Sequence, residues 1–141
     1  MLNQEIGANK TEVKNMQPLV LAMIGDSVQT LFVRTHIAKT YGVKVNKMNK
    51  WVSSVVSAGA QFKTFKKIEE TLSEDEQDVA RRARNTHIHT KAKNFSYNEY
   101  IHATALEALL GFLYLTKKYD RLNEFLNISV EELTAEKIAK I

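Results

Sequence analysis

Residues 19–34, LVLAMIGDSVQTLFVR, decide the fold, because they form a long apolar run with helical spacing that contains a single acid. Pro18 suits the first turn of a helix and Gly42 suits the position after its last turn. The sequence therefore predicts one helix that starts at Pro18 and ends just before Gly42. Asp26, in the middle of it, is the only acid in residues 13–68. Acids seldom occupy such apolar surroundings unless another group pairs with them or binds them.

A second apolar stretch, residues 103–115 (ATALEALLGFLYL), repeats this arrangement around Glu107. Small residues stand one turn before each acid, Ala22 before Asp26 and Thr104 before Glu107, so a neighbouring helix can approach both carboxylates closely. If the two helices pack together, the carboxylates face one point. Two hard oxygen ligands in a basic protein suggest Mg²⁺, which commonly binds one or two protein carboxylates. The alternative is a structural carboxylate that is satisfied by a helix cap or a buried arginine.

The rest of the chain predicts an all-α protein with one domain. Five glycines and one proline are too few for a turn-rich β architecture, and no segment alternates like a strand. Ser73 with Glu76 forms a capping box that opens one helix, and Ser129 with Glu132 predicts a second one for a helix over residues 130–141. Residues 1–17 are polar with little periodicity. We expect them to be a loosely ordered N-terminal segment, followed by a catalytic domain over residues 18–141.

Composition also restricts where the protein acts. The chain contains no cysteine, which excludes disulfides and thiolate metal sites and is typical of a reducing cytosol. Its start lacks the basic-then-apolar layout of a signal peptide, and no apolar run approaches the roughly 20 residues of a membrane-spanning helix. We therefore expect a cytoplasmic protein without a membrane partner. Nothing in the sequence indicates a small-molecule substrate.

Positive charge is concentrated in two stretches that contain no acid, residues 27–68 and residues 79–98. Clustered lysine and arginine side chains release counterions from phosphates, so this pattern is typical of nucleic-acid binding, although a merely solvated basic face is the alternative. Basic and amide side chains near a predicted loop suit the phosphates and 2′-hydroxyls of A-form RNA. The predicted RNA-binding residues are Arg81, Arg82, Arg84, Asn85, Lys91, Lys93 and Asn94.

Four segments in order resemble the catalytic domains of the ribonuclease III family: LAMIGDSVQTLFVR, VSAGAQ, RRARNTH with TKAKN, and YIHATALEALLGFLYL. The chain is most similar to Mini-ribonuclease III, the short bacterial class without a double-stranded-RNA-binding domain. This resemblance implies a homodimeric, Mg²⁺-dependent hydrolase, an endonuclease that cleaves double-stranded RNA. It also implies a role in rRNA processing for ribosome biogenesis, namely maturation of the ends of the 23S ribosomal RNA precursor.

The resemblance also assigns roles to the two acids. Asp26 matches the Asp of the family's Gly-Asp motif and Glu107 matches the Glu of its second acidic helix, so both are expected to be catalytic metal ligands. Full-length ribonuclease III places two further acids where this chain has Ala22 and Thr104. The loss of these acids is similar to the short class, but it supports an alternative, a catalytically silent double-stranded-RNA-binding dimer.

Two other functions have less support in the sequence. Ser27 lies beside Asp26, but no GxSxG turn or partnered histidine indicates a serine hydrolase. A helix-turn-helix DNA-binding protein would need a recognition helix with base-reading side chains, and none stands out.

Overall fold

The computed structural model describes residues 8–86, 96–134 and 137–138, and within these ranges it contains helices but no strand. The elements in chain order are α1 (Lys10–Lys14), α2 (Pro18–Tyr41), α3 (Val45–Val56), α4 (Ala58–Ile68), the short 3₁₀ helix η1 (Glu69–Thr71), α5 (Glu74–Asn85), α6 (Ser96–Leu115) and α7 (Tyr119–Ser129). The described helices confirm the predicted all-α class. None of them combines the length and apolarity needed to cross a bilayer.

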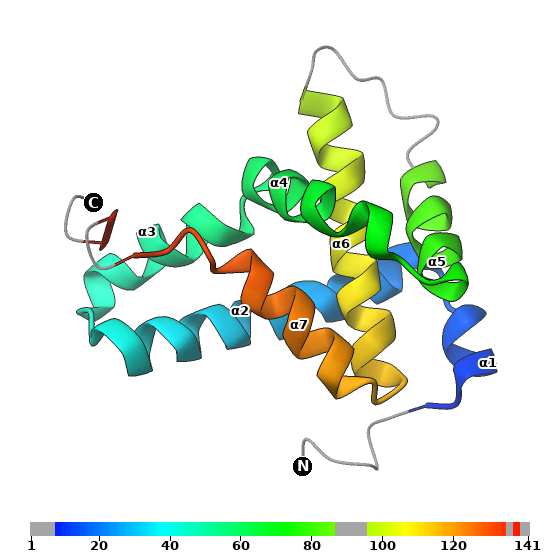
Figure 1. The fold of residues 1–141 in the computed structure, drawn as a ribbon, viewed down its shortest axis with the longest axis horizontal. Helices are drawn as coiled ribbons and strands as arrows, with labels where there is room; N and C mark the ends of the chain where they lie inside the picture. The colour runs from blue at the N-terminus through cyan, green and yellow to red at the C-terminus, as the bar shows by residue number, and fades with distance from the viewer. Residues whose placement is uncertain (1–7, 87–95, 135–136, 139–141) are drawn as a thin grey trace.

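Helix α6 is the central element of the fold (Figure 1). It packs most extensively against α2, and also against α4, α5 and α7. Because neighbours surround it, α6 is apolar on nearly every side, and Leu106, Leu109 and Phe112 are completely buried. A second core cluster lies at the far end of the molecule, where Ile37 of α2 packs with Trp51 of α3.

The ends of the helices follow local sequence signals. Helix α2 runs from Pro18 to Tyr41 as predicted, and Gly42 ends it in the left-handed conformation with φ of 57°. Most side chains are strained in that conformation, so glycine is the favoured residue there. The predicted capping box at the start of α5 is confirmed, because the Ser73 and Glu76 side chains accept each other's backbone N–H groups.

The N-terminal segment was expected to be loosely ordered, but its described part contains a short helix that packs on the core. Residues 8–17 contain α1, and Val13 of this short helix is completely buried in the main core. Lys10 and Lys14 both form ion pairs with Asp75 of α5. Tertiary contacts therefore order this segment, although it has almost no hydrophobic periodicity of its own.

The predicted helix over residues 130–141 does not begin at 130: residues 130–134 are not helical, whereas the described residues 137–138 are. The Ser129 hydroxyl donates to the Leu126 carbonyl at 2.6 Å, so Ser129 ends α7 instead of capping a new helix. Turns follow, and the next cap is Thr134, whose side chain accepts the Lys137 backbone N–H at 3.1 Å. A serine hydroxyl can bond to a carbonyl of the preceding turn as well as to a following N–H, and here the former contact forms.

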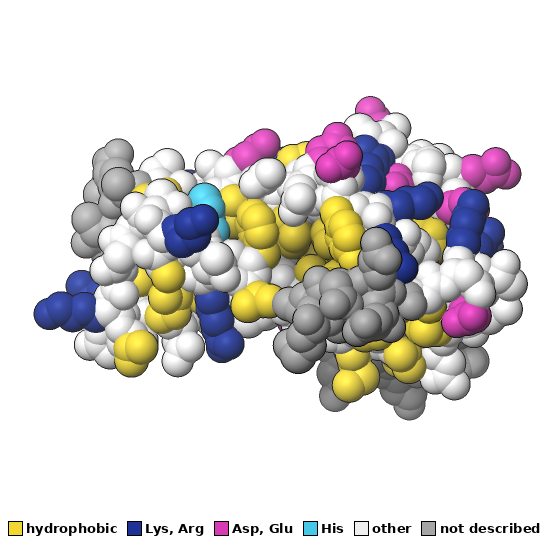
Figure 2. Space-filling view, turned by 90° about the horizontal axis from the view of Figure 1, so that it is seen from below, with side chains coloured by type: hydrophobic (Ala, Val, Ile, Leu, Met, Phe, Trp, Pro, Cys, Tyr) yellow, Lys and Arg dark blue, Asp and Glu magenta, His cyan; other side chains and the backbone are white. Residues whose placement is uncertain are grey.

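Several large hydrophobic side chains remain exposed. Figure 2 shows hydrophobic side chains reaching the surface across the middle of the molecule on the face seen from below. Helix α2 presents more of the exposed large hydrophobic residues than any other described helix. The set comprises Leu19, Val20, Met23 and Leu31 of α2, with Val45, Tyr100 and Tyr119 elsewhere.

Candidate active site

The most extensive contact between two helices in the described structure is the crossing of α2 and α6, where two glycines face the opposite backbone. A Cβ atom on Gly25 would lie 1.7 Å from the Glu107 carbonyl oxygen. A Cβ atom on Gly111 would lie 2.1 Å from the Leu21 carbonyl oxygen. Only glycine fits at such distances, so this pair allows the two backbones to touch. Asp26 follows Gly25 directly and Glu107 lies one turn before Gly111, so the same crossing brings the two acids together.

The crossing places the Asp26 and Glu107 carboxyl groups close enough to interact electrostatically. Asp26 is exposed and Glu107 is partly buried. Burial, together with the hydrogen bond and negative charge of Asp26, raises the pKa of Glu107 to about 8, and a contact with Gln61 opposes this increase. Within the described residues, neither acid forms an ion pair with a lysine, arginine or histidine. The pair is therefore a site of uncompensated negative charge.

This donor set fits Mg²⁺. Two adjoining carboxylates repel each other when both are ionised, and a divalent cation between them would remove that repulsion. The described residues contain no cluster of three or more histidine, cysteine or acidic side chains that could enclose a metal. Mg²⁺ retains several water ligands and needs only one or two carboxylates. Positions 22 and 104 supply no further acid, because they hold an alanine and a threonine. Ala22 is buried, and the Thr104 hydroxyl donates to the Tyr100 carbonyl at 3.0 Å.

The predicted RNA-binding residues of α5 have unlike surroundings. Arg81 is exposed and pairs with Asp78 of its own helix, and Asn85 is exposed. Arg84 lies over the Phe65 ring, 5.8 Å from its centroid. The remaining predicted residues, Lys91, Lys93 and Asn94, lie outside the described residues.

Arg82 has a different role from the predicted one. Its guanidinium is partly buried and donates to the backbone carbonyls of Lys14, at 2.5 Å, and Met16, at 3.5 Å. These bonds attach the segment around α1 to α5. We therefore correct the interpretation of Arg82 from an RNA contact to a structural residue, because its donors are directed to the protein's own main chain.

Two residues of the site were not predicted. Gln29 of α2 and Gln61 of α4 are buried, and the Gln61 amide nitrogen donates to the Gln29 side-chain oxygen at 2.8 Å. Gln61 also opposes the increase in the pKa of Glu107. A signal for Gln29 was present, since it is an uncharged polar residue inside the same apolar run as Asp26. Gln61 lies on an amphipathic helix, where its burial could not be distinguished from exposure.

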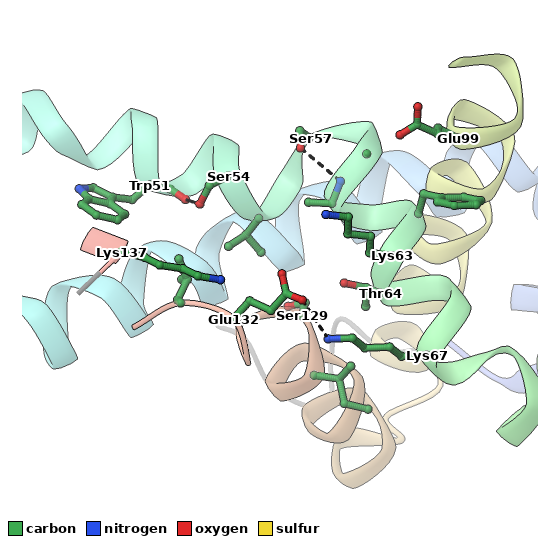
Figure 3. Close-up of a pocket in the computed structure, with 16 residues that line it drawn as sticks. Trp51, Ser54, Ser57, Lys63, Thr64, Lys67, Glu99, Ser129, Glu132 and Lys137 are labelled. Carbon is green, nitrogen blue, oxygen red and sulfur yellow. Dashed lines mark hydrogen bonds and ion pairs between the residues drawn. The ribbon is translucent and has the colours of Figure 1, made fainter. Parts of the chain in front are cut away.

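A cavity of about 560 Å³ between α3, α4 and the segment after α7 is the main rival site (Figure 3). Figure 3 shows the Glu132 carboxylate between the ammonium groups of Lys63, Lys67 and Lys137. Lys67 also pairs with Glu131 at 3.5 Å. The charges of this cavity largely compensate one another, and neither Asp26 nor Glu107 lines it. The acid pair at the helix crossing is therefore the better candidate for an active site.

Comparisons with known proteins agree with this geometry. Residues 19–118 match the family model described as Ribonuclease III domain, a range that includes both acids and both crossing glycines. The chain is 42% identical over 122 residues to Mini-ribonuclease 3 of Thermoanaerobacter sp. (strain X514), covering 86% of each chain. It is 39% identical over 117 residues to Mini-ribonuclease 3 of Staphylococcus aureus, covering 82% of this chain and 87% of that protein.

A solved structure has the same fold. The crystal structure of a protein from Fusobacterium nucleatum superposes with a TM-score of 0.74 at 33% sequence identity, covering 83% of this chain and 93% of that one. The family match spans more than half of the chain, and the curated relatives cover most of it. The chain therefore belongs to the ribonuclease III family of endoribonucleases, and within it to the Mini-ribonuclease III class.

Proposed function

We propose that this protein is a Mg²⁺-dependent endoribonuclease that cleaves double-stranded RNA and matures the ends of the 23S ribosomal RNA precursor in the cytoplasm. The observation that carries the proposal is the glycine crossing that brings Asp26 and Glu107 together, with no ion pair to either acid among the described residues. Family membership supports hydrolysis of RNA. The choice of the 23S precursor rests on the resemblance to Mini-ribonuclease III.

Asp26 and Glu107 are the residues that would hold Mg²⁺. Bound there, the ion would neutralise charge that develops on the phosphodiester and lower the pKa of a coordinated water. Asp26 is exposed, so its carboxylate is accessible to a substrate, whereas partial burial restrains the Glu107 side chain. The rigid glycine crossing holds both acids on helices, which position side chains more accurately than loops do.

The RNA is proposed to lie along α5 and the segment that follows it. Arg81, Arg84 and Asn85 supply donors for phosphates and 2′-hydroxyls, and Lys91, Lys93 and Asn94 stay in this proposal from the sequence alone. Such contacts read shape and charge, which suits a nuclease that acts on duplexes. Arg82 is left out because it binds the main chain.

A homodimer is the proposed working assembly. An apolar groove on α2 and α6, lined by Met23, Leu31 and Tyr114 among others, remains uncovered in the single chain. Met23 is 73% exposed, which is unusual for a large hydrophobic side chain. Ser27, the neighbour of Asp26, also lines the groove. A two-fold dimer across this face would place one acid pair near each strand of a duplex. Sedimentation analysis should therefore find a wild-type dimer and a Met23→Glu monomer.

The function is tested with a labelled RNA duplex that is incubated with purified protein in Mg²⁺ and then in EDTA. We expect cleavage only in Mg²⁺, and none by Asp26→Asn at any Mg²⁺ concentration. Duplex DNA of the same sequence is the matched control substrate. Binding of the RNA duplex without cleavage by the wild-type protein would favour the silent RNA-binding dimer. A precursor transcript that contains the 23S termini then tests the substrate, with cuts expected at the paired ends.

A further inference from the structure

Arg34 of α2 is the one arginine of the chain whose side chain has no partner among the described residues. The other four arginines each bind a group of the protein itself: Arg81 pairs with Asp78, Arg82 donates to main-chain carbonyls, Arg84 lies over the Phe65 ring and Arg121 pairs with Glu76. Arg34 is exposed, and its guanidinium forms no ion pair and lies over no aromatic ring within the described ranges. Because arginine stays protonated, all of its donors are available to an anion from outside the chain.

The elements next to Arg34 supply no carboxylate. Residues 27–68 contain no acid, so α2 after Asp26, all of α3 and all of α4 lack one. Figure 2 shows Lys and Arg side chains but no Asp or Glu at the left end of this face, where Figure 1 places α3 and the end of α2. An anion that approaches Arg34 therefore meets no negative charge from these helices.

Arg34 also lies close to the acid pair along α2. It follows Asp26 by eight residues, which corresponds to about 12 Å along the helix axis and about 80° around it. It follows Ser27 by seven residues, nearly two full turns, so it lies in line with Ser27 on the surface of the helix. Ser27 lines the apolar groove next to Asp26. Arg34 therefore belongs to the side of α2 on which the acid pair and the groove meet, but it is not one of the residues that line the groove.

A phosphate of the substrate is the anion that fits this position. The planar guanidinium matches phosphate oxygens, to which it can donate two parallel hydrogen bonds. Each strand of a duplex carries a phosphate every few ångströms along its axis, so a duplex at the acid pair has other phosphates at the distance of Arg34.

A carboxylate of a second copy is the alternative partner. A copy that docks in the groove would present α2 and α6, whose acids are Asp26, Glu99 and Glu107. Two of these three are the proposed metal ligands. The RNA backbone is therefore the better partner for Arg34.

We propose that Arg34 is a substrate-binding residue, whose guanidinium binds a backbone phosphate of the RNA duplex beside the acid pair. This inference rests on the proposed cleavage of duplex RNA. It adds to the predicted RNA contacts of α5 a contact from the helix that carries Asp26, so the bound strand is fixed relative to one of the two acids. The contact reads the backbone and not the base sequence.

The test is the substitution Arg34→Ala in the full-length protein. Binding of a fluorescently labelled RNA duplex is measured by anisotropy in EDTA, so the readout requires neither metal nor cleavage. We expect the dissociation constant to rise about 10-fold and the salt dependence of binding to fall by about one unit of logarithmic slope per subunit on the duplex. In Mg²⁺, KM should rise by a similar factor while kcat changes little, because a remote phosphate contact is made equally in the ground state and the transition state.

Lys39→Ala is the matched control. Lys39 is an exposed cation of the same helix and forms no ion pair among the described residues, but it lies 13 residues after Asp26, on the opposite side of α2. This variant should bind the duplex within about two-fold of the wild type. Arg34→Lys should keep the salt slope but lose several-fold in affinity, because it retains the charge and loses the fork.

The outcomes separate this inference from the function on which it rests. If the wild type neither binds nor cleaves duplex RNA, the proposed function itself is wrong. If the wild type does both and Arg34→Ala has the same dissociation constant and KM, the function stands and the role of Arg34 is overturned. An equal loss in Lys39→Ala would also overturn it, because the effect would then be one of total charge. Sedimentation analysis of Arg34→Ala should find the assembly of the wild type, and dissociation would assign Arg34 to a second copy instead of RNA. If Arg34→Ala fails to fold, Arg34→Gln provides the same test.

Discussion

Glu107 and Glu76 are both acids on the inside of the helical bundle, but their surroundings are opposite. The Glu76 side chain is 5% exposed and accepts hydrogen bonds from Arg121 at 2.8 and 3.0 Å. Its capping box with Ser73 adds a further bond. These partners outweigh the cost of burial and lower its pKa. Glu107 has the acid Asp26 as its neighbour, and its pKa is raised to about 8.

The difference distinguishes a structural carboxylate from a functional one. Glu76 shows what a buried acid looks like when folding alone determines its environment, since its carboxylate is paired with Arg121. The Asp26 and Glu107 pair lacks such a partner within the described residues, and evolution seldom retains an unfavourable arrangement of this kind without a use for it.

The largest effect is expected from Glu107→Gln. Metal-assisted stabilisation of the reacting phosphate is worth several kcal/mol, so cleavage of duplex RNA in Mg²⁺ should fall by about 1,000-fold or more. Glu76→Gln should leave cleavage by the folded protein within a few-fold of wild type, but lower the free energy of unfolding by about 2 kcal/mol because hydrogen bonds to a charged arginine weaken. Initial cleavage rates and urea unfolding measure both. Equal losses of activity in the two variants would contradict the assignment of Glu107 as a functional acid and Glu76 as a structural one.

A large loss of stability is expected from Gly25→Ala. The added methyl group would meet the Glu107 carbonyl oxygen, so α2 and α6 must separate at a cost of about 3 kcal/mol. This separation should also weaken Mn²⁺ binding, because it moves Asp26 away from Glu107. Gly59→Ala is the control, since its methyl group meets only the movable end of the Glu99 side chain. Urea unfolding of both variants checks the prediction, and a Gly25→Ala protein as stable as Gly59→Ala would contradict it.

The two acids should give opposite pH dependences of stability when metal is removed with EDTA. The pKa of Glu107 rises from 4.5 to about 8 on folding, so its contribution is fully present below pH 4.5 and is lost as the pH rises toward 8. The pKa of Glu76 is lowered on folding, so its contribution is present above pH 4.5 and is lost as the pH falls further.

Melting temperatures across this pH range, with Glu107→Gln and Glu76→Gln as references, give the two contributions. As the pH rises, the wild type should become less stable relative to Glu107→Gln. Relative to Glu76→Gln, the wild type should lose stability only at acidic pH. A Glu107 contribution that instead grows between pH 5 and 8 would show that a cation of the protein compensates this acid.

The smallest effects concern two neighbouring arginines. Arg82→Ala should lower the free energy of unfolding by about 1 kcal/mol, because it removes the bonds to the Lys14 and Met16 carbonyls. Arg81→Ala should barely change stability but reduce the salt dependence of RNA binding by about one unit of logarithmic slope. Unfolding curves and binding titrations at several salt concentrations measure both. The reverse assignment would follow if Arg82→Ala changed the salt slope and Arg81→Ala did not.

Much of the fold could be predicted from particular residues. The start and end of α2 at Pro18 and Gly42 and the capping box of Ser73 with Glu76 depend on contacts within one turn, and the structure confirms them. The docking of α1 and the use of Arg82 depend on partners far away in the chain, whereas at Ser129 a bond to the preceding turn forms in place of the predicted cap. Segments with weak periodicity leave such contacts undetermined until the core forms.

The chain on its own marked Asp26 and Glu107, because an acid in an apolar run is visible in one dimension. It also implied their convergence through a helical pattern and a family resemblance. Folding decided the rest: the glycine crossing sets how closely the acids approach, and the hydrogen bond between Gln61 and Gln29 joins two helices that are separate in the sequence. Helix formation depends on neighbours in sequence, so a sequence pattern can predict it. Side-chain contacts between helices depend on packing geometry at the scale of one ångström, and a sequence pattern does not report that geometry directly.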